Sequence, residues 1–144
     1  MIFLKSNHPT ISITGRYEST LQHSYRFSFP AVSIKLRIKD SSVSVRMQDF
    51  GNDGMQNHFN VVVDGLVHSV IKLSNDVKDI PLYTKTDDNW HSIELFKRTE
   101  SLVGECEFFG FVVDSEACLD AVEESALLVE FIGDSITCGC LVNS

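Results

Sequence analysis

The sequence predicts an all-β fold: an antiparallel jelly-roll β-sandwich, followed by the first strand and turn of an α/β domain. Apolar and polar residues alternate with a period of two in roughly eight segments separated by turn residues, and no segment before residue 115 has a helical period. The pattern changes late in the chain. We therefore expect a sandwich at residues 1–114, a linker at residues 115–126 and the start of a second domain at residues 127–144.

The first long strand is predicted at residues 32–39, VSIKLRIK, in which apolar residues alternate with serine, lysine and arginine. Such alternation is typical of a half-buried antiparallel strand. Two shorter candidates precede it, TISITGR at residues 10–16 and SYRFSF at residues 24–29. The residues expected to face inward from the long strand and the next one are Ile34, Leu36, Ile38, Val43 and Val45.

Two short polar segments are predicted to form hairpin turns. Residues 40–42, Asp-Ser-Ser, separate the long strand from SVSVRMQDF, and their turn chemistry suits a hairpin. Asp64-Gly65 separates HFNVVV from LVHSVIKL and is the stronger signal, because Asp-Gly readily adopts the backbone of a two-residue hairpin loop.

Two further strands follow before the pattern changes. WHSIELFKRT, residues 90–99, places His91, Ile93 and Leu95 on one face, and CEFFGFVVD is rich in aromatic residues. SEACLDAVEESA, residues 115–126, is acidic and reads as a linker or a single helical turn. LLVEFIG is almost continuously apolar, as in strands that are buried on both faces of a parallel sheet.

Composition excludes several classes of function. Twelve Lys and Arg residues against 20 Asp and Glu residues give a net charge of −8, which argues against nucleic acid and anionic membranes as partners. No apolar run approaches the ~20 residues that span a bilayer. The start, MIFLKSNHPT, has too short an apolar stretch for a signal peptide, so the compartment stays open.

Gly133-Asp134-Ser135 follows the apolar strand directly. A buried strand that leads into a glycine-containing turn is where α/β enzymes present a nucleophile, and backbone N–H groups at the start of a helix stabilise an oxyanion. The alternative is that Asp134 or Ser135 only caps a helix. The three residues alone leave both interpretations open.

FIGDSITCG, residues 131–139, resembles the first conserved block of the SGNH (GDSL-type) hydrolases. Together with the preceding sandwich, it makes the chain similar to carbohydrate esterase family 2, which contains acetylxylan esterase-like enzymes with an N-terminal jelly roll. Further stretches carry the resemblance in the family's order: ITGRYE, FSFPAVSIKLRI, NHFNVVVDG, HSIELFKRTE and FFGFVVD.

The resemblance implies that Ser135 is a nucleophile whose own backbone N–H contributes to the oxyanion hole, with no cofactor or metal. The family's base and its other oxyanion donors belong to later blocks. We therefore expect the chain to be the N-terminal part of an esterase that deacetylates polysaccharides such as xylan, and to be inactive by itself. The alternative is a non-catalytic carbohydrate-binding or scaffolding module.

The histidines offer no obvious base within the chain. We expect His91 to be a core residue because it shares a strand face with Ile93 and Leu95, and His68 to be exposed near a turn. The others, His8, His23 and His58, have no acidic partner that the sequence reveals.

Four other features are expected to be structural. QDFGNDGMQN, residues 48–57, offers Asp49, Asn52 and Asp53 as calcium ligands but lacks the EF-hand order, so a solvated turn is favoured. KRTE, residues 97–100, is expected to form ion pairs at the surface of the sandwich or against the hydrolase domain. Cysteines and aromatic residues are expected to be ordinary thiols and core residues rather than a metal site or a sugar-binding surface: Cys106, Cys118, Cys138, Cys140, Tyr25, Tyr83 and Trp90.

Overall fold

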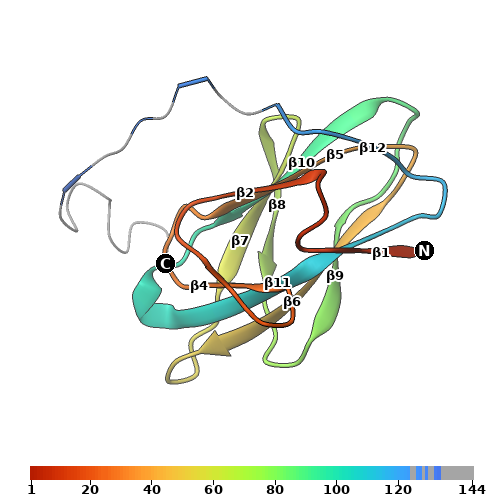
Figure 1. Ribbon diagram of the computed structural model, residues 1–144. Coiled ribbons are helices and arrows are strands. Elements are labelled where there is room, and N and C mark those ends of the chain that lie inside the picture. Colours follow the sequence, from red (N-terminus) through yellow and green to blue (C-terminus); the bar gives the residue numbers. More distant parts are fainter. Residues whose placement is uncertain (124–125, 128, 130–131, 134–144) are drawn as a thin grey trace.

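The computed structural model, which describes residues 1–123, 126, 127, 129, 132 and 133, consists of two six-stranded antiparallel sheets packed face to face (Figure 1). This arrangement confirms the predicted sandwich. Sheet A has the order β3-β4-β11-β6-β9, and β1 also pairs with β11. Sheet B has the order β12-β5-β10-β7-β8, and β2 also pairs with β5. The described residues contain no α-helix, only a 3-10 turn at Ser101–Val103.

The strands of sheet A are β1 (Ile2–Lys5), β3 (Glu18–Ser19), β4 (Tyr25–Phe27), β6 (Val43–Gly51), β9 (Lys78–Tyr83) and β11 (Gly104–Val113). The strands of sheet B are β2 (Ile11–Thr14), β5 (Ser33–Lys39), β7 (His58–Val63), β8 (Leu66–Lys72), β10 (Trp90–Lys97) and β12 (Cys118–Asp120).

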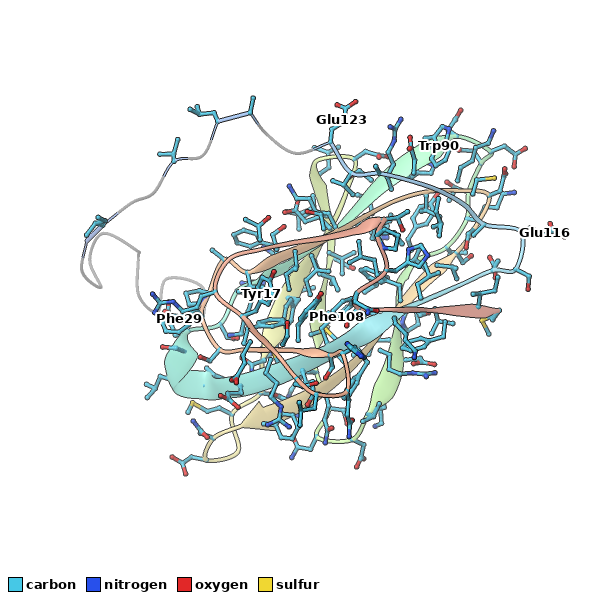
Figure 2. All side chains as sticks on the ribbon, viewed as in Figure 1. Tyr17, Phe29, Trp90, Phe108, Glu116 and Glu123 are labelled. Atoms are coloured by element: carbon cyan, nitrogen blue, oxygen red, sulfur yellow. The ribbon has the colours of Figure 1, made fainter. Side chains whose placement is uncertain are left out.

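The core lies between the sheets and is built by the alternating apolar residues. All five residues predicted to face inward from β5 and β6 are at most 1% exposed. Ile93 and Leu95 of β10 and Phe108 of β11, which is labelled near the middle of Figure 2, are fully buried. Burial of these side chains is the main favourable contribution to folding.

The predicted hairpin at residues 40–42 is wrong. The strands on either side, β5 and β6, belong to different sheets, so the segment crosses from one layer to the other. Asp114 holds this crossing in place: its backbone N–H donates to Ser41 Oγ at 2.8 Å, and its carboxylate accepts from the backbone N–H of Ser42 at 2.8 Å. Turn residues indicate that the chain changes direction, but they do not indicate which strand it pairs with next.

The hairpin predicted at Asp64-Gly65 is confirmed. β7 and β8 pair directly around it, and both turn residues have positive φ angles, 50° and 81°. Positive φ at both central positions is the geometry that Asp-Gly favours, because the glycine has no Cβ to strain.

The linker expected at residues 115–126 contributes a strand rather than a helical turn. Residues 118–120 form β12, which pairs with residues 37–39 of β5 at the edge of sheet B. The single turn of helix considered for this segment is not found in its described residues.

Candidate functional site

The two central residues of the predicted catalytic motif, Asp134 and Ser135, lie outside the described residues. Gly133 is described; it is exposed and belongs to no strand or helix. The assignment of Ser135 as nucleophile, and the domain division at residue 127, stay predictions.

Three described residues of the apolar segment before the motif are largely exposed. The described side chains of Leu127, Val129 and Ile132 are 73%, 55% and 91% exposed. Apolar residues in such a run are ordinarily buried. Their exposure agrees with a segment patterned for the interior of another sheet.

The sandwich holds the start of the segment that leads to the motif. Asp120 Oδ2 lies 3.1 Å from Arg37 Nη1, and the Arg37 guanidinium stacks over the ring of Trp90, 5.3 Å from its centroid. A groove of about 280 Å³ lies here, and Val122 and Glu123 line it from the departing chain. Trp90 and Glu123 both lie along the upper edge of the view in Figure 2.

The outward face of sheet B forms the other side of this groove, where Lys35, Arg37 and Ser92 line it. These residues alternate along β5 and β10 with buried ones, so they project away from the core. The chain therefore leaves the sandwich across the outward face of sheet B.

His91 is paired with two carboxylates, which the sequence did not reveal. Its Nδ1 lies 2.7 Å from Asp64 Oδ2 and its Nε2 lies 3.0 Å from Asp87 Oδ1. The hydrogen bond with Asp64 is the largest influence and raises the pKa of His91, against the opposing effect of partial burial. Both ring nitrogens can donate only in the imidazolium form, so this arrangement favours a protonated His91.

His91 is therefore satisfied by hydrogen bonds, but the expectation that it is a core residue is wrong: its side chain is 14% exposed and is bound by carboxylates from two loops. Asp64 lies in the β7–β8 turn, 27 residues before His91, whereas Asp87 lies in the loop before β10, four residues before His91. With both nitrogens engaged by carboxylates, His91 is a bridge between two loops rather than a free base. His68 is exposed, as expected, on the edge strand β8.

Lys97 contradicts the expectation of surface ion pairs at residues 97–100. It is fully buried, and its Nζ donates to the backbone oxygen of Thr99 at 2.6 Å and to Thr99 Oγ1 at 3.0 Å. Burial lowers the pKa of Lys97. The reason for the error is that Lys97 continues the inward alternation of β10, a position two residues after Leu95.

The predicted solvated turn at residues 48–57 is also wrong for its two ends. Asp49 and Asn57 are at most 1% exposed, and the Asn57 amide donates to Asp49 Oδ1 at 2.7 Å. Thr99 Oγ1 donates to Asn57 Oδ1 at 2.7 Å, which links this pair to Lys97. We refer to Lys97, Thr99, Asn57 and Asp49 as the buried polar chain.

No metal site appears in the part of the chain that the structure describes. Among those residues, no group of three histidine, cysteine, aspartate or glutamate side chains is placed to hold an ion. Asp49 is directed to Asn57, and Asp53 is exposed. No helix of the described residues is long and apolar enough to cross a membrane.

The two described cysteines are free thiols, and the three aromatic residues named above differ in how far they are buried. Cys106 is a buried free thiol and Cys118 an exposed one, so the two are not bonded to each other. Tyr83 is buried and Tyr25 is half-buried, but the expectation that Trp90 is a core residue is wrong: it is 39% exposed on the outward face of β10, beneath Arg37. The other two cysteines, Cys138 and Cys140, lie outside the described residues.

Comparison with known proteins identifies the fold's relatives. Residues 13–121 match the profile of the family described as "Carbohydrate esterase 2 N-terminal". The chain belongs to this family. The matched range includes ten of the twelve strands in full, from β3 to β12, and the second half of β2.

Two curated relatives are similar over most of this chain. The cellulase/esterase CelE of Acetivibrio thermocellus is 28% identical over 92% of the chain, which corresponds to 16% of the relative. An acetylxylan esterase / glucomannan deacetylase of Cellvibrio japonicus is 33% identical over 81% of the chain, which corresponds to 30% of the relative. The chain thus spans less than a third of either protein.

A solved structure agrees with these relatives. A family two carbohydrate esterase from Clostridium thermocellum, solved in complex with cellohexaose, has a TM-score of 0.77 and 28% identity to this chain. The similarity covers 89% of this chain and 38% of that one.

Proposed function

We propose that this chain is the N-terminal part of a carbohydrate O-acetyl esterase in which Ser135 is the nucleophile. One observation carries the proposal. A family 2 esterase sandwich, matched over residues 13–121, is followed within a few residues by the apolar segment LLVEFIG and by Gly-Asp-Ser, which resemble a hydrolase motif. The substrate class is acetylated plant polysaccharide, which the names of the relatives support.

The proposed chemistry is a two-step acyl transfer. Ser135 Oγ attacks the acetyl carbonyl carbon while its proton passes to a histidine base, and the sugar oxygen leaves with that proton. Water then attacks the acetyl-enzyme and releases acetate. The backbone N–H of Ser135 is a donor to the oxyanion.

The base is assigned to a later block of the family, so the 144-residue chain by itself is predicted to be inactive. Members of a catalytic triad act as a unit, and loss of the base costs on the order of 10⁶ in kcat. His91 does not offer a replacement for the missing base, because both of its ring nitrogens are already bound by carboxylates.

The test is an acetate-release assay on acetylated xylan. In the complete protein, Ser135→Ala should abolish turnover, whereas Ser125→Ala, a matched loss of a hydroxyl in the linker, should not change it. The 144-residue chain should release no acetate. Turnover by the Ser135→Ala protein would refute the role of Ser135, and turnover by the short chain that depends on Ser135 would refute the assignment of the base.

A further inference from the structure

A large groove lies on the outward face of sheet A. It measures about 770 Å³, within the range of ~300–1,000 Å³ typical of ligand sites. Its floor is β11, one wall is the β3–β4 hairpin with its loop, and the other wall is formed by β6 and Val77 before β9. These strands lie side by side in the lower front of Figure 1.

The floor is shaped by a bulge in β11. Phe108 pairs with Met47 and Gly110 pairs with Arg46, so Phe109 is an extra residue on this strand. The bulge lets Phe108 and Phe111 both point into the core while Phe109 lines the groove. Bulges of this kind re-aim a side chain and are frequent beside functional sites.

A buried carboxylate fixes the floor next to Phe109. Glu107 is 5% exposed, accepts a hydrogen bond from Ser24 Oγ, and accepts another from Arg26 Nε at 2.9 Å. The Arg26 guanidinium also lies over the ring of Phe50, 4.6 Å from its centroid. The carboxylate of Glu107 and the ring of Phe50 together fix the orientation of the Arg26 guanidinium.

The hairpin wall is ordered by its own hydrogen bonds. Thr20 Oγ1 accepts from the backbone N–H groups of Gln22 and Ser24, at 3.3 and 3.2 Å. Ser24 is 1% exposed and connects the hairpin to Glu107. A wall held in this way needs little reorganisation on binding, which lowers the entropic cost of a complex.

Several polar groups that line the groove have no protein partner. Among the described residues, no hydrogen bond or ion pair engages the Glu18 carboxylate, the Gln22 side-chain amide or the Nη atoms of Arg26. They offer acceptors and donors beside the aromatic ring of Phe109. Planar polar side chains around a ring platform match the hydroxyl groups and the apolar face of a sugar.

We propose that this groove binds a neutral oligosaccharide segment. The charged residues lining it are Glu18, Glu107 and Arg26, whose sum is negative in a chain of net charge −8. This balance disfavours anionic chains such as polyuronates. A sugar chain without charge fits both the platform and the free donors and acceptors.

The described residues after β11 that run up to residue 123 lie away from this groove. β12 and residues 122–123 run along sheet B and its outward face, whereas the groove lies on sheet A. The groove would give the sandwich a polysaccharide contact of its own, in addition to the proposed esterase activity and independent of Ser135.

The experiment uses the 144-residue chain labelled with ¹⁵N and titrated with cellohexaose and with xylohexaose. Saturable shifts of amide signals should appear at millimolar or lower ligand, concentrated in β3, β4, β11 and the facing part of β6. Phe109→Ala should weaken binding about tenfold, the loss of one good contact. Phe96→Ala removes an exposed phenylalanine from the outward face of sheet B and should leave binding unchanged.

A second variant keeps the test valid if Phe109→Ala does not fold. Glu18→Ala combined with Gln22→Ala alters only exposed side chains and should also weaken binding severalfold. Absence of saturable shifts with both sugars, shifts confined to sheet B, or binding that neither groove variant weakens would overturn the proposal. Tighter binding of a polyuronate would overturn the assignment to a neutral ligand. Because the assay measures no ester hydrolysis, its failure leaves the role of Ser135 untouched.

Discussion

Replacing Lys97 tests whether the buried polar chain stabilises the sandwich. Lys97 has no exposed surface, and among the described residues its ammonium donates hydrogen bonds to two atoms of Thr99. Thr99 is hydrogen-bonded to Asn57, and Asn57 is hydrogen-bonded to Asp49. Asp49 is thus the buried carboxylate of the buried polar chain, and the Lys97 ammonium offsets its negative charge. Removing one partner of a buried charge pair costs about 3–5 kcal/mol, because the other charge stays buried without compensation.

Two variants separate the charge from the packing. Lys97→Met keeps most of the alkyl chain and removes the ammonium. The ammonium and the carboxylate are joined through neutral groups rather than in direct contact, so we expect a loss of about 2–3 kcal/mol of unfolding free energy, below that of a directly paired ion. Lys97→Ala adds a cavity of several methylene groups, and we expect a total loss of about 4–5 kcal/mol.

Urea unfolding followed by Trp90 fluorescence measures both values. Lys35→Met is the matched control, because the Lys35 side chain is 39% exposed and lies 3.7 Å from Glu94; exposed pairs are worth about 0–1 kcal/mol. If Lys97→Met unfolds at the same urea concentration as the parent protein, the ammonium is not offsetting a buried charge and the reasoning fails.

Two other predictions concern the core and the pH dependence of stability. Leu36→Ala should cost ~2–5 kcal/mol in urea unfolding through a cavity at a fully buried position, and a loss below ~0.5 kcal/mol would contradict its place in the core. The raised pKa of His91 means that its bridge to Asp64 and Asp87 is fully present below about pH 6.5 and is lost as pH rises through that raised pKa. The stability difference between the parent and His91→Gln should therefore shrink between about pH 6 and pH 9, and a difference that grows over this range would refute the bridge.

The alternating pattern was sufficient to predict the layers but not the strand neighbours. Alternation reports which face of a strand is buried, and it did so correctly for Ile34, Leu36 and Ile38. The same pattern is compatible with any antiparallel partner. The segment at residues 40–42 was misassigned because a corner between two sheets and a hairpin within one use the same turn residues.

Polar residues in the interior were the other source of error. Lys97 occupies an inward position of β10, but its charge suggested the surface. Asp49 occupies an inward position of β6 in the same way. Lys97 is held by Thr99, two residues later, and Asp49 by Asn57, eight residues later, and both partners lie outside the strands. The residue types alone do not show that these side chains will meet in the interior.

The two features that bear on function lie on different sheets. Sheet B carries β12 and the Asp120–Arg37 ion pair, so the segment that leads to the predicted nucleophile starts from its outward face. Sheet A carries the bulge at Phe109 and the ordered hairpin, so its outward face holds the proposed sugar groove. A polysaccharide held on sheet A would raise the local concentration of acetylated chain near a domain attached through sheet B, even where the two sites contact different parts of the polymer. The groove would then strengthen binding of extended chains and leave hydrolysis of small acetyl esters unaffected. In the complete protein, Phe109→Ala should therefore slow acetate release from acetylated xylan and leave hydrolysis of p-nitrophenyl acetate unchanged.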